Sequence, residues 1–261
     1  MNSAQQLYEL WADEAKIDAE LGRSLDPRGV DWLYDAFAAL GPKPGDLVLD
    51  AGARDAKHAI RLVRDLGVRA ISLDPVPVHC ERARAAVADA GLSGEIDVIE
   101  AAIESMPLAD ASVDWIWCRD VLVHVDAPSG LAELARALRP GGSLFAYVTL
   151  TTESLEPRER AELVEALAIL TFDAEPLEAA AAAAGLSLRS VDRLGSEWRE
   201  RMLEDGTWNA GEDLLHLARL HRGGFTGPEA AAAWGGLTWG IYQLLGKLCP
   251  TVYVWSKASS T

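Results

Sequence analysis

The chain has 261 residues, with 24 lysines and arginines against 40 aspartates and glutamates, and a net charge of −16. A content of 49% hydrophobic and 25% charged residues is typical of folded globular proteins, which excludes disordered and fibrous architectures. The acidic balance argues against nucleic acid and anionic membrane surfaces as partners, because both are bound through clustered lysines and arginines.

The cysteines and the first residues exclude further classes. Cys80, Cys118 and Cys249 are far apart and form no CxxC pair, so neither a disulfide framework nor a metal site is predicted. The N-terminal stretch carries acidic residues and lacks the apolar centre of a signal peptide. No segment reaches the ~18 apolar residues that a membrane helix requires. We therefore expect a cytoplasmic protein.

In chain order, helices are predicted at residues 3–21 and 28–40, before a short buried strand within 45–50. Strands and helices then alternate as far as residue 150. Further strands are expected at 68–73, 95–100, 113–118 and 143–150, with helices at 76–90 and 128–138. The sequence Arg139-Pro-Gly-Gly142 is expected to form a turn. Such alternation predicts parallel βαβ units.

The pattern changes after residue 150. Helices are predicted at 157–170 and 175–184, a strand at 186–191 and a closing strand at 251–255. We expect an α/β protein with a Rossmann-like, mostly parallel seven-stranded sheet, helices on both faces and a helical cap inserted before the last strand. The predicted parts are an N-terminal helical lid (1–41), the ligand-binding core (42–194 and 249–261) and a substrate cap (195–248).

Two motifs indicate an adenosine-type ligand. In VLDAGARDAKHA (48–59), Gly52 lies where a strand gives way to a helix, so the backbone can approach a ligand beside a helix N-terminus. Asp74 ends the next strand, at the spacing of an acidic residue that accepts hydrogen bonds from ribose hydroxyls. Arg54 and Lys57 stand where a dinucleotide-binding GxGxxG turn has glycines, which argues against NAD.

Several segments together resemble the class I S-adenosylmethionine-dependent methyltransferases. These are VLDAGARDAKHA, SLDPVP (72–77), AAIESMPLADASVDWIWCRDVLVHV (101–125) and LARALRPGGSLFAYV (134–148). The resemblance covers residues 45–150 and implies S-adenosylmethionine as cofactor and S-adenosylhomocysteine as product. The chain departs from the family pattern at Arg54 and Ala56, where the first motif has glycines. It also departs at Ala102, where many members hold the adenine amino group with an acid.

By this resemblance, Ala51 and Gly52 lie close to the methionine and ribose parts of the cofactor, with Asp50 nearby. The ribose hydroxyls bind Asp74, the adenine borders Ala102 and Ile103, and Arg119 faces the methionine portion. The complete predicted cofactor set is Asp50, Ala51, Gly52, Asp74, Pro75, Ala102, Ile103 and Arg119.

His124 is the candidate general base, because it follows the fourth strand and an imidazole titrates near neutral pH. The alternative is that His124 packs on the cofactor or caps a turn. Asp120, four residues earlier, is expected to orient its ring if the segment is helical. His216 and His221 are expected to be structural or exposed to solvent.

Aromatic residues are dense in the predicted cap, which indicates a largely apolar acceptor pocket for a drug-sized molecule. The predicted substrate-binding set is Tyr8, Trp11, Trp198, Trp208, Trp239 and Tyr242. We expect in-line methyl transfer to a small organic molecule, a bacterial secondary metabolite, by a monomer or homodimer. The alternatives are a relative with non-methyl chemistry, such as decarboxylation or cyclisation, and a non-catalytic binding protein. Whether oxygen, nitrogen or carbon is methylated stays open.

Overall fold

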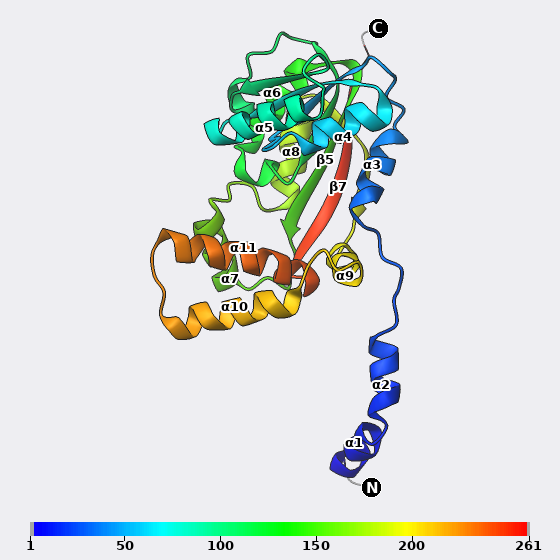
Figure 1. The fold of residues 1–261 in the computed structure, drawn as a ribbon, viewed down its shortest axis with the longest axis vertical. Helices are drawn as coiled ribbons and strands as arrows, with labels where there is room; N and C mark the ends of the chain where they lie inside the picture. The colour runs from blue at the N-terminus through cyan, green and yellow to red at the C-terminus, as the bar shows by residue number, and fades with distance from the viewer. Residues whose placement is uncertain (1–2, 260–261) are drawn as a thin grey trace.

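The structure is a computed structural model, and it describes residues 3–259 (Figure 1). Its sheet has seven strands in the order β3-β2-β1-β4-β5-β7-β6, and β7 is antiparallel to its neighbours β5 and β6. All seven predicted strands are present, and the predicted fold class is confirmed. The strands are β1 (Leu47–Ala51), β2 (Arg69–Asp74), β3 (Ile96–Glu100), β4 (Val113–Arg119), β5 (Leu138–Thr151), β6 (Leu186–Arg193) and β7 (Leu248–Lys257).

Helices cover both faces of the sheet. The α-helices are α1 (Ser3–Trp11), α2 (Glu14–Leu21), α3 (Val30–Ala38), α4 (Lys57–Leu66), α5 (Pro77–Asp89), α6 (Ala127–Ala137), α7 (Pro157–Leu167), α8 (Ala174–Ala183), α9 (Glu197–Glu204), α10 (Ala210–Gly223) and α11 (Pro228–Leu244). Short 3₁₀ turns are η1 (Ile103–Ser105) and η2 (Leu122–His124). None of the helices in residues 3–259 is long and apolar enough to cross a membrane.

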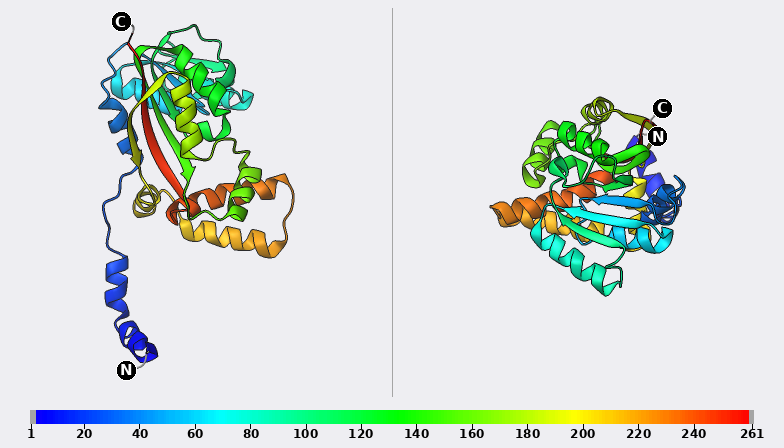
Figure 2. Two further views of the ribbon diagram at one scale, coloured as in Figure 1. Left: turned by 180° about the vertical axis from the view of Figure 1, so that it is seen from behind. Right: turned by 90° about the horizontal axis from the view of Figure 1, so that it is seen from above.

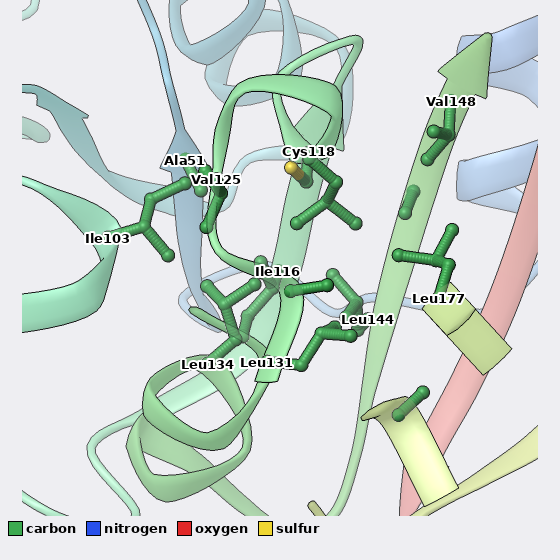
Figure 3. Packing of buried hydrophobic residues seen from close by; sticks show 14 of the residues in the cluster. Ala51, Ile103, Ile116, Cys118, Val125, Leu131, Leu134, Leu144, Val148 and Leu177 are labelled. Carbon is green, nitrogen blue, oxygen red and sulfur yellow. The ribbon is translucent and has the colours of Figure 1, made fainter. Parts of the chain in front are cut away.

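Two apolar layers hold the sheet between the helices. On one face, Ile116 of β4 and Leu144 of β5 pack against Leu131 and Leu134 of α6 (Figure 3). On the other face, side chains of α3, α4 and α5 cover β1, β2 and β4. Because both faces are buried, the central strands are nearly continuous apolar runs, and that is why they could be predicted from the sequence.

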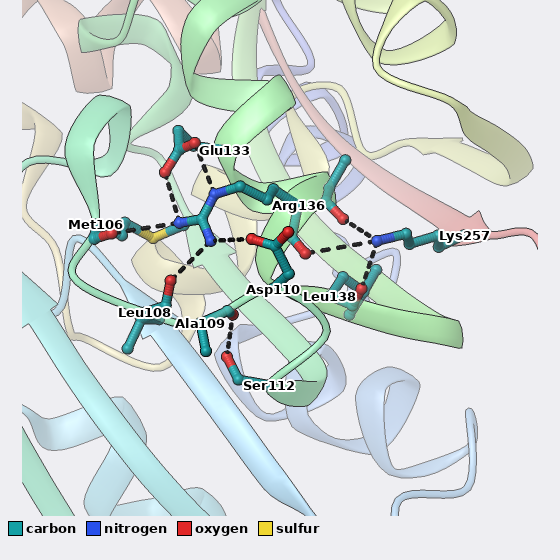
Figure 4. A network of polar contacts seen from close by, with 10 residues as sticks. Met106, Leu108, Ala109, Asp110, Ser112, Glu133, Arg136, Leu138 and Lys257 are labelled. Carbon is teal, nitrogen blue, oxygen red and sulfur yellow. Dashed lines mark hydrogen bonds and ion pairs between the residues drawn. The ribbon is translucent and has the colours of Figure 1, made fainter.

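The predicted turn at residues 139–142 is wrong, because β5 begins at Leu138 and continues through it. Leu138 pairs with Val113, and the register shifts between Val113 and Trp115. Gly142 fits this irregularity, since a Cβ there would lie 2.6 Å from the Asp114 carbonyl oxygen. Polar side chains anchor the neighbouring backbone: Lys257 Nζ donates to the Leu138 carbonyl at 2.8 Å (Figure 4).

The N-terminal prediction of one helix over residues 3–21 is replaced by α1 and α2, which break at Ala12 and Asp13. They form an arm that extends away from the α/β domain (Figure 1), and neither helix buries a residue. Tyr8 is 69% exposed and Trp11 is 57% exposed. In this arrangement the arm does not cover the carboxyl ends of the strands, and its role as a lid stays a prediction.

Three helices, α9, α10 and α11, lie between β6 and β7, as the fold prediction expected for the segment before the last strand. In Figure 1 and in the left view of Figure 2, α10 and α11 run side by side below the sheet with α7 next to them. The shorter α9 lies against the end of the sheet, with its Trp198 in the same apolar layer as α3 and α4.

Candidate active site

A cleft of about 630 Å³ opens at the carboxyl ends of β1, β2 and β4. Its walls come from the loop after β1, the end of β2, residues 119–121 after β4, Tyr147 of β5 and the helix α9. A second hollow of about 820 Å³ adjoins it between α3, α4 and α9, and the two share Lys57, His58, Arg119 and Met202. In open α/β sheets this edge is where ligands bind.

The loop after β1 has a left-handed backbone at alternate residues: φ is +78° at Gly52, +48° at Arg54 and +59° at Ala56. Only glycine adopts this region without strain, which gives a physical reason for the glycine pattern that Arg54 and Ala56 interrupt. A Cβ at Gly52 would lie 2.3 Å from Val121 Cγ2, so a side chain there would force Val121 or the loop to shift. The loop is tied to β2 by the Gly52 and Ala53 N–H groups, which both donate to the Leu73 carbonyl.

Asp74 lines the cleft at the end of β2. One carboxylate oxygen accepts from the Arg54 N–H at 2.9 Å, and the other accepts from the Val76 N–H at 2.9 Å and contacts His79 Nδ1 at 3.0 Å. The carboxylate is therefore held in place, and the oxygen facing Arg54 keeps a second acceptor position for a ligand hydroxyl. His79, also in the cleft wall, was not predicted.

Asp50 and Ala51 lie beneath the cleft and are buried. Asp50 accepts a hydrogen bond from the Ala59 N–H at 3.1 Å, which joins β1 to α4. Burial raises the pKa of Asp50 to about 7.

Ala102 and Ile103 are not part of the cleft wall, and Ile103 is buried next to Val125 in the core (Figure 3). Their predicted contacts with adenine stay a prediction.

Arg119 lies in the wall that both hollows share, and His58 is its neighbour. The Arg119 Nη1 group donates to His58 Nε2 at 3.1 Å, so His58 is neutral with its proton on Nδ1, which donates to the Tyr34 hydroxyl at 2.5 Å. Burial, and then the charge of Arg119, lowers the pKa of His58 to about 3. Arg119 Nε is buried and has no hydrogen-bond partner among residues 3–259.

Asp120 follows β4 with a left-handed backbone, φ +54°. Its Oδ1 accepts from the Thr149 N–H at 3.1 Å, and its Oδ2 accepts from Trp239 Nε1 at 3.3 Å. The expectation that Asp120 orients His124 is therefore wrong, because the segment between them is not a continuous helix and the carboxylate points to β5 and α11. Burial raises the pKa of Asp120. His124 is exposed and lines the cleft.

Comparison with known proteins agrees with this geometry. A family model described as a methyltransferase domain matches residues 49–146. The chain is 40% identical over 164 residues to a dimethylglycine N-methyltransferase of Parasynechococcus marenigrum, a match over 59% of this chain and 57% of that protein. It is 34% identical over 140 residues to the methyltransferase GfsG of Streptomyces halstedii, a match over 52% of this chain and 48% of that protein. The chain thus spans about half the length of these curated relatives.

Among solved structures, one from Galdieria sulphuraria, described as a sarcosine dimethylglycine methyltransferase, has a TM-score of 0.70. The match covers 88% of this chain and 86% of that one at 22% identity, which shows the shared fold. Residues 49–146 therefore match a methyltransferase domain, and the sheet order is the one expected from the resemblance to the class I S-adenosylmethionine-dependent methyltransferases. The cofactor of the family is S-adenosylmethionine, and S-adenosylhomocysteine is its product.

The residues of this cleft fit that cofactor. Asp74 offers an acceptor position to a ribose hydroxyl, and the unpartnered Nε of Arg119 offers a donor and a positive charge to a carboxylate. At position 52 of the loop after β1, glycine leaves the backbone without a side chain, so a ligand can approach it closely. Of the predicted cofactor residues, the cleft brings together Gly52, Asp74, Pro75 and Arg119.

The aromatic residues predicted to bind the acceptor lie in different parts of the structure, and only some of them are at the cleft. Trp198 is 1% exposed and packs on Tyr147 at 5.2 Å between ring centroids, and both line the cleft. Trp239 lies behind Asp120 and stacks on Phe172. Trp208 and Tyr242 are outside the cleft wall, as are Tyr8 and Trp11 on the arm.

The expectation of a largely apolar acceptor pocket stays a prediction for this cleft. Ten of its eighteen lining residues are charged or histidine, and Arg199 of α9 is one of them. Sequence reasoning missed His58, Tyr147 and Arg199. His58 lies inside the first motif and Arg199 follows Trp198, but neither motif nor spacing indicated which way their side chains point. His216 and His221 lie on α10, away from the cleft wall.

Proposed function

We propose that this methyltransferase transfers a methyl group to the amine nitrogen of a small molecule. The observation that carries the proposal is Asp120, which lines the cleft at the end of β4 and whose carboxylate is held by the Thr149 N–H and Trp239 Nε1. Tyr147 and Trp198 form an aromatic wall in the same cleft. A carboxylate beside aromatic faces attracts a cationic ammonium group, whereas it repels the anionic form of an acidic hydroxyl.

The chain's own residues position the cofactor and the acceptor amine and accept the proton of the ammonium group. Asp74 would hold the ribose and Arg119 the methionine carboxylate, and S-adenosylmethionine when bound supplies a methyl group activated by a positively charged sulfur. Alignment of the amine contributes up to roughly 7–11 kcal/mol to such a displacement. An amine attacks only as the free base, so Asp120 accepts the ammonium proton. Its raised pKa makes it a stronger base than an exposed aspartate. His124, at the mouth, is the second candidate base.

The named relative supports nitrogen as the methylated atom, because the Parasynechococcus protein is a dimethylglycine N-methyltransferase. The expected secondary-metabolite acceptor, the non-methyl alternatives and the monomer or homodimer state stay predictions. The arm stays our candidate lid. Its exposed Leu7, Tyr8 and Trp11 present an apolar surface that closure over the acceptor would bury.

The variant Asp120→Asn tests the proposal, with an amine acceptor in excess. Loss of the base is expected to lower kcat by about 10²-fold or more, with the affinity for S-adenosylhomocysteine changed less than about threefold. Asp97→Asn, at an exposed aspartate of β3, is the matched control. Unchanged kcat in Asp120→Asn, or methyl transfer to oxygen or carbon acceptors only, would contradict the proposal.

A further inference from the structure

The helix α10 lies on the outside of the inserted helices, and its outer face is exposed. It runs below α7 and α11 (Figure 1), and α11 is the helix that it mainly packs against. None of its fourteen residues is buried. Leu214 is 53% exposed and Leu215 is 48% exposed, and the exposed Ala218 lies about one turn further along the same face. Adjacent exposed apolar side chains of this kind mark a surface that a partner covers.

The charges beside these apolar residues are ordered along α10. Glu212 precedes the leucines, and Arg219 and Arg222 follow them. Glu212 and Arg219 lie on the same side of the helix, because seven residues span about two turns. Within the described part of the chain, neither arginine side chain makes a hydrogen bond or an ion pair, and the Glu212 carboxylate reaches only His216 Nε2, at 4.0 Å. Both ends of this face therefore carry charges that are free to pair with another molecule.

A helix with this order of charges is complementary to a second copy of itself that runs in the opposite direction. An antiparallel two-fold pairing brings Glu212 of one copy beside Arg219 and Arg222 of the other, and the symmetry makes this contact twice. Near the two-fold axis, Leu215 of each copy meets Ala218 of the other, and the small alanine lets the helices approach closely. A parallel pairing would instead place like charges opposite each other.

The helix dipole by itself favours acidic residues at the start of a helix and basic residues at its end. It does not account for the exposed leucines between the charges. Pairing with a second copy removes these leucines from water and gives both arginines a carboxylate, so it accounts for both features together.

We propose that the chain forms a homodimer through α10, which packs antiparallel against α10 of a second copy. This inference is independent of the proposed methyl transfer to an amine, because α10 contributes no residue to the cleft wall. Two helices of fourteen residues make a small contact. We therefore expect a reversible dimer with a Kd of roughly 10–100 μM.

The test uses charge reversals that can be recombined. Glu212→Lys makes both ends of the face positive, and the double variant Arg219→Glu/Arg222→Glu makes both ends negative. Each variant is expected to raise the Kd of its own dimer at least about tenfold, since like charges then face each other. An equal mixture of the two variants is expected to form a heterodimer with a Kd within about threefold of the wild-type value, because each end again meets the opposite charge.

Sedimentation velocity of the full chain over about 1–300 μM gives the Kd of each dimer. Glu81→Lys and Arg82→Glu/Arg84→Glu, at exposed positions of α5, are the matched controls. They change the net charge by the same amounts and are expected to leave the Kd unchanged. Thermal unfolding and the affinity for S-adenosylhomocysteine, which the α10 variants should leave as in the wild type, check that each variant is folded.

A wild type that stays monomeric over this whole range would overturn the proposal. A dimer that both α10 variants leave intact would overturn it too, because another surface, such as the apolar face of the N-terminal arm, would then join the two copies. Loss of the dimer in each variant without recovery in the mixture would show that these charges do not pair across an antiparallel contact, which also contradicts the proposal. Loss in each variant with recovery in the mixture supports it.

Discussion

His58 gives the sharpest prediction about the electrostatics of the site. Its folded-state pKa of about 3 compares with an ordinary value of 6.5, so the unfolded chain takes up a proton between these pH values that the folded chain does not. The stability that neutral His58 contributes is present above pH 6.5 and is lost as the pH falls towards 3. At about 1.4 kcal/mol per pH unit, the loss between pH 6.5 and 4.5 is about 2–3 kcal/mol.

The variant His58→Gln keeps an acceptor for Arg119 and a donor for Tyr34 and removes the titration. Urea unfolding at pH 4.5, 5.5 and 6.5 gives the free energy of unfolding of both proteins. The wild type minus variant difference is expected to fall by about 2–3 kcal/mol from pH 6.5 to 4.5. A difference constant to within about 0.5 kcal/mol would refute the reasoning, because His58 would then titrate as it does in the unfolded chain.

Asp50 provides a control, because its contribution to stability is expected to change with pH in the opposite direction to that of His58. Its folded pKa is raised to about 7, so its contribution is fully present at low pH and is lost as the pH rises from about 4 to about 7. The free energy of unfolding of the wild type minus that of Asp50→Asn is therefore expected to fall as the pH rises. Over the same pH window, the corresponding difference for His58→Gln is expected to rise. Two differences that move in the same direction would contradict both assignments.

Three further predictions concern ligand binding. Asp74→Ala should weaken S-adenosylhomocysteine binding by about 1.5–3 kcal/mol in calorimetry, through loss of hydrogen bonds to a charged group, and unchanged affinity would remove Asp74 from the site. Ala102→Asp should tighten cofactor binding if the adenine lies beside η1, and no gain in a folded variant would place the adenine elsewhere. Trp239→Phe keeps the stacking on Phe172 and removes the hydrogen-bond donor to Asp120. It should therefore lower kcat and leave the affinity for S-adenosylhomocysteine nearly unchanged. A loss of that affinity would contradict a role for Trp239 in catalysis alone.

Trp198 illustrates why burial decides which variants are informative. The sequence suggested it as an acceptor-binding residue, but it is 1% exposed and shares an apolar layer with α3 and α4. Truncation of a buried tryptophan to alanine costs about 3–5 kcal/mol, so Trp198→Ala would lower stability together with activity. Trp239→Phe avoids this difficulty.

The strands could be predicted because each is a local apolar run that is buried on both faces. The cofactor loop could be predicted for a similar reason, since Gly52 follows β1, Asp74 ends β2, and parallel strands bring their carboxyl ends to one edge. The turn expected at residues 139–142 failed because a register shift opposite Val113 accommodates Pro140, Gly141 and Gly142 within β5.

The electrostatic partners could not be predicted from local patterns. His58 lies between Tyr34 and Arg119, which are 24 and 61 residues away in the chain, and Trp239 is 119 residues from Asp120. These contacts depend on how α3, α4 and α11 pack against the sheet.

Methyl transfer to an amine is proposed for the cleft at the ends of β1, β2 and β4. The most direct measurement incubates the full chain with S-adenosylmethionine carrying a deuterium-labelled methyl group and an equal mixture of amine, alcohol and phenol acceptors, and identifies products by mass spectrometry. We predict label on the amine nitrogen, with one S-adenosylhomocysteine formed per product. Label on oxygen or carbon, or no transfer by a protein that binds S-adenosylhomocysteine, would contradict it.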